Sequence, residues 1–410
     1  MLNTSSTVSS TAPNLQTSIC GDSHLVNRSS ETIALHKPLS PCDNPAAPRP
    51  WSNNTDLPDY IKEYFDWHVE TTCKATAHSH TDVKYLIVQC LKEFGTCGGL
   101  SDRLRQLPAY IIAAYKMKRV LLYQWTKPCA IEEFFMSPPF GINWTVPEWL
   151  EVPTRSYAQI QMFKGLSKYI ANNDFTKEVL TIKIQYPAVV FYNEQIGSLG
   201  DRRNSYTRVY RSLFNCMFAL VPQIQSMVNE RMEHLTLTPG TYVSVHVRAR
   251  HPDSGHYNVT KHKDKKIDKS GGLLFEGQTK ELIISTVEKA LNCASILSNS
   301  STSTNKIYFA SDSHHVNQYA LLLNNGSSSS MHITGISHRK EPLHFDKPMD
   351  DNEKPCDFYD SFVDIWLLSS AKCTVSGLGG YGLLAAYLSK DPTCHINYLN
   401  KRQQDCSPQN

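Results

Sequence analysis

The sequence predicts an α/β protein made of two halves, each holding a parallel sheet. In the first half, apolar runs of strand length at residues 84–91 and 119–125 flank a segment whose apolar residues recur at helical spacing. In the second half, the same alternation of strands and helices restarts at residue 241. A strand, helix, strand order is a βαβ unit, and its two strands are parallel. The length of 410 residues accommodates both halves, at about 150 residues per domain.

The composition is that of a globular protein with little net charge. Hydrophobic residues make up 40% of the chain and charged residues 19%. Lys and Arg number 41 against 38 Asp and Glu, a formal net charge of +3, so no broad positive field favours nucleic acid as a partner. We also expect no membrane span in this chain, because its apolar stretches are too short to cross a bilayer, and no signal segment.

The first 58 residues are rich in Ser, Thr, Pro and Asn and show no hydrophobic periodicity. Such a segment buries too little apolar surface to offset the entropy of ordering, so residues 1–58 are predicted to be a disordered stem. We then expect an N-terminal domain over residues 59–238, a C-terminal domain over 239–400 and a tail over 401–410.

In the N-terminal domain, the strand at 84–91 leads through a Gly-containing loop into a helix over about residues 100–114. The strand at 119–125 follows, and long helical periodicity over 206–237 predicts one helical connection between the halves. In the C-terminal domain, strands are predicted at 241–248, 306–310, 332–336 and 372–376, and helices at 281–297, up to 323, at 358–369 and at 381–388. The lysine-rich stretch within 253–272 and the serine run at 327–330 are expected to be solvated loops.

The chain holds 12 cysteines and no Cys-x-x-Cys pair, so the short spacings of a zinc site are missing. Cys216, Cys293 and Cys373 stand among apolar neighbours and are expected to be reduced and buried. Disulfide bonds can form at Cys356, Cys394 and Cys406 if the compartment oxidises thiols. Asn-x-Ser/Thr sequons, which lean weakly toward the secretory pathway, begin at Asn3, Asn27, Asn53, Asn143, Asn258, Asn299 and Asn325.

Candidate site residues follow from the rule that ligands of open α/β sheets bind beyond the carboxyl ends of the strands. The first such loop contains Gly98 and Gly99 and continues as Leu-Ser-Asp-Arg-Leu-Arg, with Arg103 in the first helical turn. Adjacent glycines let the backbone approach a ligand closely, and the helix start offers N–H groups to an anion. The alternative is a tight strand-to-helix turn with a surface arginine pair.

The second loop ends the strand that opens the C-terminal domain. Alternation places His246, Arg248 and Arg250 on one face. A desolvated guanidinium needs an anionic partner, and the concentration of His and Arg favours a phosphate over an internal salt bridge.

The third loop, residues 373–382, contains Gly-x-Gly-x-x-Gly between a predicted strand and helix. A dinucleotide fold places an acidic residue about 20 positions further on, where this chain has Lys401, so a glycine-cradled diphosphate fits better than NAD. Asp312 and Asp364 each either bind a ribose, base or sugar hydroxyl or serve as a helix cap or satisfied polar residue.

The usual carboxylate spacing for a divalent ion on a nucleotide sugar is missing, because no Asp-x-Asp occurs. Arginine and helix N-termini would have to neutralise a diphosphate instead. His78, His80 and the pair His314-His315 lack suitably spaced partners and are not expected to bind metal.

Together and in this order, the three loops resemble the superfamily of GDP-fucose-dependent fucosyltransferases, which includes α-1,6-, Nod-factor and protein O-fucosyltransferases. Its Gly-Gly-Leu-x-(Asp/Asn)-Arg-Leu-Arg motif is matched by residues 98–105 and its His-x-Arg motif by His246 and Arg248. Its later motifs resemble residues 309–312 and 362–382, and the resemblance covers roughly residues 80–390.

The resemblance implies a GT-B-like fold, in which two Rossmann-like domains face a cleft and the C-terminal one binds GDP-fucose. It implies metal-independent, inverting transfer of fucose to a glycan or glycoprotein, in the Golgi lumen. The implied catalytic residues are Arg248, which binds the β-phosphate, His246 and Asp253. The implied donor-binding residues are Gly98, Gly99, Arg103, Asp312, Asp364, Ser376, Gly377 and Gly379.

Position 251 departs from the family pattern, because it holds His where Asp is frequent, and Asp253 lies two places later. A catalytically impaired nucleotide-sugar or glycan-binding protein of the same fold is therefore an alternative. A phosphate-ester hydrolase using Arg250 and His251 is a second one. Asp253, Glu276 and His251 are the candidates for a general base.

Overall fold

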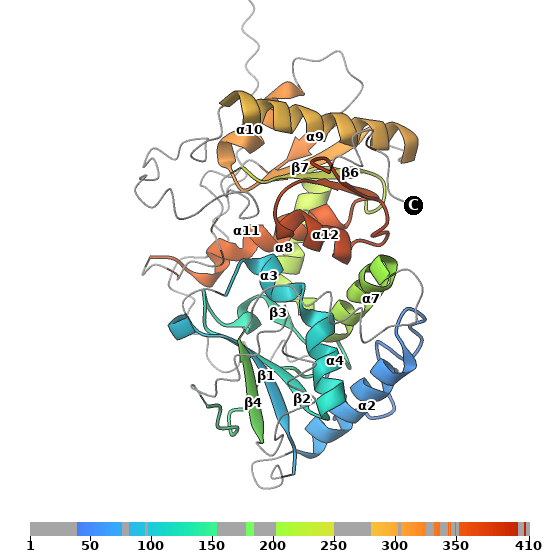
Figure 1. Cartoon of the computed structure of the whole chain (residues 1–410), viewed down its shortest axis with the longest axis vertical. Coiled ribbons are helices and arrows are strands. Elements are labelled where there is room, and N and C mark those ends of the chain that lie inside the picture. Colours follow the sequence, from blue (N-terminus) through green and yellow to red (C-terminus); the bar gives the residue numbers. More distant parts are fainter. Residues whose placement is uncertain are drawn as a thin grey trace, which may run out of the picture. The chain divides into compact units, whose positions relative to one another are not determined.

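The computed structural model describes residues 39–75, 82–94, 97–153, 178–183, 202–249, 280–301, 305–324, 332–336, 343, 345, 349, 352–400 and 406. All of these residues fall within one compact unit. Two parallel sheets organise this unit (Figure 1). The predicted α/β class with two Rossmann-like sheets is therefore confirmed.

The first sheet has the order β2-β1-β4, with β1 at Tyr85–Cys90, β2 at Val120–Trp125 and β4 at Val179–Lys183, all parallel. The sequence predicted β1 and β2 but not the short β4. The crossover between β1 and β2 contains two helices instead of the one predicted, α3 (Leu100–Leu104) and α4 (Leu107–Met117). Pro108 lies in the first turn of α4, and because proline has no N–H, it starts this helix rather than continuing α3.

Residues 39–58, predicted to belong to a disordered stem, are instead packed against α2 (Asp59–Lys74). Trp51 is 1% exposed, its ring lies 5.2 Å from that of Phe65, and its indole N–H donates to Asp66. A disulfide joins Cys42 to Cys73. One buried indole and one cross-link anchor a segment whose average composition is polar, so the stem prediction is wrong for residues 39–58. The rest of the predicted stem lies outside the described residues.

The long helical stretch predicted between the halves is broken in the structure. It consists of α7 (Arg202–Met217), the short strand β5 (Ala219–Leu220) and α8 (Pro222–His234). Pro222 opens α8, and β5 pairs with β3 (Phe135–Met136), so a proline and a strand pairing divide a continuous apolar pattern.

The second sheet has the order β10-β9-β6-β7-β8 and is parallel throughout. Its strands are β6 (Val243–Val247), β7 (Lys306–Ser311), β8 (His332–Gly335), β9 (Cys373–Ser376) and β10 (His395–Asn397). The four predicted strands are present, and β10 was not predicted. From β6 the chain proceeds to β7 on one side and later returns to β9 on the other. The order therefore reverses between β6 and β9, where α/β proteins bind ligands.

Helices cover both faces of the second sheet (Figure 1). The helices are α9 (Lys280–Ser301), α10 (His314–Leu323), α11 (Tyr359–Ser369) and α12 (Gly380–Leu388). The valines of β6 pack with α9 in one hydrophobic cluster, while α11 and α12 belong to another. The second cluster also includes residues of the first half, and the rings of Phe134 and Phe362 stack within it at 4.5 Å. A shared core therefore joins the halves across residue 238, the predicted domain boundary, which stays a prediction.

The cysteine predictions are partly corrected. Cys216 is free and buried, as predicted. Cys293 and Cys373 were expected to be reduced, but they are bridged to Cys406 and Cys394. Their apolar neighbours in sequence gave no sign of these distant partners. Cys356 is also disulfide-bonded, and a further disulfide joins Cys90 to Cys97.

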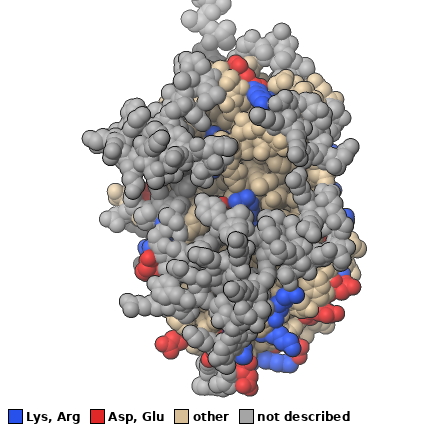
Figure 2. Space-filling view, viewed as in Figure 1, with Lys and Arg blue, Asp and Glu red and all other residues tan. Residues whose placement is uncertain are grey.

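On the face drawn in Figure 2, basic side chains of the described residues lie close to acidic ones, with no extended region of one sign among them. Within the part of the chain that the structure describes, no helix has both the length and the apolar character needed to span a bilayer.

Candidate functional site

The reversal of strand order between β6 and β9 brings Arg248 and Gly379 together. Arg248 directly follows β6 and is half-buried, while Gly379 precedes α12. Gly379 has a φ of +85°, which L side chains rarely adopt, and a Cβ built on it would collide with the Arg248 guanidinium. Only a glycine lets the arginine lie this close to the backbone.

The start of α12 adds partial positive charge beside Arg248. The first N–H groups of a helix have no partner within the helix, and its dipole is positive at this end. Burial of apolar side chains such as Leu384 and Leu388 holds the nine-residue helix against the sheet. A guanidinium and a helix start at the point of strand reversal are typical of a site for a phosphate-bearing ligand.

Ser376 and Gly377 lie between β9 and this helix start. The Ser376 hydroxyl is 2.8 Å from Nε2 of His395, and burial lowers the pKa of His395 to about 4. A Cβ on Gly377 would overlap the Tyr398 ring. The structure thus places both predicted residues at the turn, with the serine hydroxyl paired to a histidine that sequence reasoning missed.

His246 lies beneath α12 as a buried, neutral imidazole. It is 3% exposed, and its ring centroid is 5.1 Å from that of Tyr381. Burial, with nearby Arg248 adding to it, lowers the pKa of His246 to about 3. Its Nδ1 has no hydrogen-bond partner among the described residues. The positive charge at this strand end is therefore that of Arg248, not of the histidine.

The two aspartates predicted to bind donor accept hydrogen bonds from the protein itself. Asp312 follows β7, and its Oδ1 accepts the N–H of Ala249 at 2.6 Å, which fixes the chain just after Arg248. Asp364 is buried in α11 and accepts the Tyr308 hydroxyl at 2.6 Å. For Asp364 this matches the alternative of a satisfied polar residue.

The glycine motif of the first half meets the start of α12 through Ser101. The Ser101 hydroxyl donates to the carbonyl of Gly380 at 2.7 Å. Gly98 has a φ of +73°, and the N–H of Gly99 donates to the Asp102 carboxylate, so both glycines shape the turn into α3. Arg105 pairs with Asp102 at 3.1 Å. Ser101 and Arg105 thus join the site from the first half, although the sequence gave them no assigned role.

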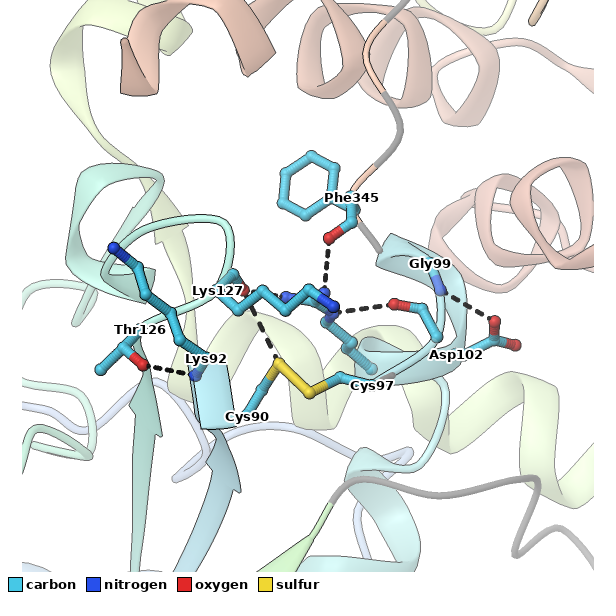
Figure 3. The surroundings of a disulfide bond; sticks show 10 residues. Cys90, Lys92, Cys97, Gly99, Asp102, Thr126, Lys127 and Phe345 are labelled. Atoms are coloured by element: carbon cyan, nitrogen blue, oxygen red, sulfur yellow. Dashed lines mark hydrogen bonds between the residues drawn. A yellow bond between two sulfur atoms is a disulfide. The ribbon is translucent and has the colours of Figure 1, made fainter. Parts of the chain in front are cut away.

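The structure places Arg103 among main-chain carbonyls. Its side chain is fully buried, and its guanidinium donates to the carbonyls of Gly98, Lys127 and Phe345. It also lies over the ring of Trp125 at 5.2 Å. Figure 3 shows Lys127 next to the Cys90–Cys97 disulfide and Phe345 on the other side of Lys127. These contacts indicate a side chain that positions loops, and the donor-binding role of Arg103 stays a prediction.

Several predicted residues lie outside the described part of the chain: Arg250, His251, Asp253, Glu276, His78 and His80. Among the described residues, no three or more His, Cys, Asp or Glu side chains are grouped to hold a metal ion. His314 and His315 lie side by side without such a group.

The comparisons with known proteins identify a shared fold. No protein-family model matches the chain, and no curated protein matches it. A structure of an Arabidopsis thaliana FUT1 mutant in complex with GDP matches with a TM-score of 0.51 and 12% identity, over 83% of this chain and 79% of that one. The chain therefore has the fold of the FUT1 structure.

Two further structures are similar at lower scores. NodZ α-1,6-fucosyltransferase soaked with GDP-fucose matches with a TM-score of 0.44 and 12% identity, over 75% of this chain and 93% of that one. POFUT1 in complex with GDP matches with a TM-score of 0.39 and 11% identity, over 78% of this chain and 100% of that one.

Proposed function

We propose that this chain is a glycosyltransferase that moves fucose from GDP-fucose to a glycan or glycoprotein acceptor, with inversion and without a metal ion. The observation that carries the proposal is Arg248 lying against Gly379, just beyond the ends of the neighbouring strands β6 and β9, where the strand order reverses. The motif resemblance and the fold shared with a GDP-bound FUT1 structure support the choice of donor.

The donor diphosphate would occupy the space between Arg248 and the start of α12. Arg248 would bind the β-phosphate, and the backbone around Gly377 and Gly379 would supply N–H groups. Gly98 and Gly99 would contribute from the first half, because the helix that they precede contacts the start of α12 through Ser101. Asp312 would act by fixing Ala249, and Asp364 by holding Tyr308.

The reaction needs charge stabilisation more than it needs a metal. As the bond between fucose and GDP breaks, negative charge grows on the diphosphate and positive charge on the sugar. The Arg248 guanidinium and the N–H groups at the start of α12 would stabilise this negative charge, and donors fixed in advance require little reorganisation. Direct attack by the acceptor hydroxyl on the opposite face of the sugar would invert the anomeric centre, with Asp253 as the proposed base.

Ligand binding and turnover test this proposal separately. We expect GDP to raise the melting temperature, with no effect of NAD or simple phosphate esters. We expect GDP release from GDP-fucose to rise when a glycan or glycoprotein acceptor is added. GDP binding without acceptor-dependent release would favour the binding-protein alternative, and no stabilisation by GDP would refute the proposal.

We further propose that the protein resides in the lumen of the secretory pathway. Disulfides persist in oxidising compartments, and the structure contains four with both partners described. The sequon asparagines Asn53 and Asn143 are exposed, and Oδ1 of Asn143 accepts the Thr145 hydroxyl at 2.7 Å. Glycosidase treatment of protein from its native host should increase its mobility on a gel, and unchanged mobility would count against this location.

A further inference from the structure

A cavity of about 460 Å³ opens where β2 ends in the first half of the chain. Strand residues such as Gln124 line it together with η2 (Ile131–Glu133) and the segment 146–152. Small-molecule sites typically occupy about 300–1,000 Å³, so the cavity has the size of a binding site. It lies at the carboxyl edge of the sheet, as ligand sites of parallel sheets do.

The polar groups of the cavity are an amide and two carboxylates. Gln89 donates its side-chain N–H to Oε1 of Gln124 at 2.7 Å, which turns the amide oxygen of Gln124 toward β1. The NH₂ group of Gln124 is thereby held ready to donate. Glu132 and Glu148 also line the cavity, and both are exposed. Fixed donors beside carboxylate acceptors match a ligand with several hydroxyl groups.

Apolar side chains form the rest of the lining. Leu150 is buried in a small hydrophobic cluster on this face of the sheet, and Val146 and Val152 pack against it. Among the described residues that line the cavity there is no Lys or Arg. Two carboxylates without a basic partner would repel an anionic ligand, whereas a neutral sugar offers hydroxyl donors on its rim and C–H groups on its faces.

We propose that this cavity binds a neutral saccharide of the acceptor. The inference rests on the proposed function, since it is the acceptor of a fucosyl transfer that would supply such a sugar. The cavity lies at the end of β2, and the loop after the adjacent strand β1 leads into α3, whose Ser101 contacts the helix start beside Arg248. An acceptor chain anchored at β2 would thus extend along one sheet edge toward the donor.

The electrostatic environment of Glu132 supports a hydrogen-bonding role. Surrounding protein removes part of its hydration, and the neighbouring Glu133 carboxylate adds to the effect, so the pKa of Glu132 is raised. The side chain is nonetheless reachable from the cavity. Because Glu132 is exposed, its carboxyl group can form a hydrogen bond with a sugar hydroxyl.

Three variants and one control separate the cavity from general effects. Val152→Trp fills the cavity, Glu132→Gln removes a carboxylate, and Gln124→Glu keeps an oxygen for Gln89 but removes the NH₂ donor. Val83→Trp is the matched control, because Val83 also packs partly buried against the same small cluster but does not line the cavity. Circular dichroism establishes that each variant is folded.

The full chain is applied to an array of neutral cello-, xylo-, galacto- and chito-oligosaccharides, sialylated and sulfated glycans, and lysine-rich peptides, and its GDP affinity is measured by calorimetry. We expect binding to neutral saccharides that is weakened about tenfold or more in the three cavity variants and unchanged in the control, with GDP affinity unchanged throughout. The inference would be overturned if the protein bound only anionic glycans or peptides, or if it bound no saccharide. It would also be overturned if the three cavity variants bound saccharides as tightly as wild type. Failure of GDP to bind would instead refute the proposed function, while the array still tests the cavity.

Discussion

The Arg103 guanidinium donates a hydrogen bond of 2.6 Å to the main-chain carbonyl of Phe345, 242 residues further along the chain. It also donates to the carbonyls of Gly98 and Lys127. One buried side chain thereby links the loop after β1, the loop after β2 and a segment that follows β8. These loops frame the first half's contribution to the site, so Arg103 sets their relative positions.

Replacing Arg103 by lysine is expected to destabilise the fold by about 2–4 kcal/mol. A single ammonium group cannot reach three carbonyls in different directions, and each buried acceptor left unpaired costs about 1–3 kcal/mol. Urea unfolding of the variant measures the loss. Arg208→Lys is the control, since Arg208 is exposed in an ion pair of 3.6 Å with Asp56 and should change stability by about 0.5 kcal/mol at most. Equal stability of wild type and Arg103→Lys would show that the three contacts carry no weight.

Gly379 and Gly240 form a natural pair for testing the Arg248 contact. Both have positive φ, +85° and +78°, but a Cβ on Gly379 would strike Arg248, whereas a Cβ on Gly240 would meet no atom of the described residues within 4 Å. Each alanine variant should lose about 1–2 kcal/mol of stability from the backbone alone. Only Gly379→Ala should also weaken GDP binding in calorimetry, because it displaces the guanidinium. If both variants bound GDP like wild type, the close approach would have no bearing on the ligand.

Arg248→Ala is expected to lower kcat by several hundred-fold, about 3–4 kcal/mol of transition-state stabilisation. Arg248→Lys should recover part of the rate, because it restores the charge but not the paired N–H groups. Initial rates of GDP release in the presence of an acceptor measure both effects. Arg208→Ala should leave the rate unchanged. Near-normal turnover by a folded Arg248→Ala protein would remove this residue from the chemistry.

The site features that could be identified from the sequence depend on local signals. Alternation along β6 identified Arg248 at the strand end, and the glycine pattern after β9 identified Gly377 and Gly379. These features depend on a few consecutive residues and on backbone conformation, so they can be recognised in the sequence without the tertiary structure.

The features that the sequence did not predict depend on distant partners. In the sequence, Arg103 looks like a surface arginine of a helix, and only the structure shows that it donates to the carbonyl of Phe345. Ser101 donates a hydrogen bond to Gly380, 279 residues away, and Cys293 forms a disulfide with Cys406, 113 residues away. Such pairs are set by tertiary packing between segments far apart in the sequence, and no periodicity along the chain encodes them.

Stability should fall as the pH drops below about 6.5, because the folded protein holds three histidines in neutral form, of which His68 and His246 are buried and His395 is half-buried. Burial lowers the pKa of His68 and of His395 to about 4 and, with Arg248, that of His246 to about 3. Between about pH 4 and 6.5 these histidines are protonated in the unfolded chain but remain neutral in the folded chain, so protonation favours unfolding. Each such group contributes up to about 1.4 kcal/mol per pH unit in this window.

His68→Gln isolates one of these contributions. His68 Nε2 lies 3.0 Å from the carbonyl of Leu121, and a glutamine amide can donate to the same oxygen without titrating. The slope of unfolding free energy against pH near about pH 5 should therefore fall by about 1.4 kcal/mol per pH unit, measured by urea unfolding at several pH values. His234→Gln, a change at an exposed position of α8, should leave the slope unaltered. A slope that His68→Gln leaves intact would mean that His68 takes up a proton in the folded protein despite its burial.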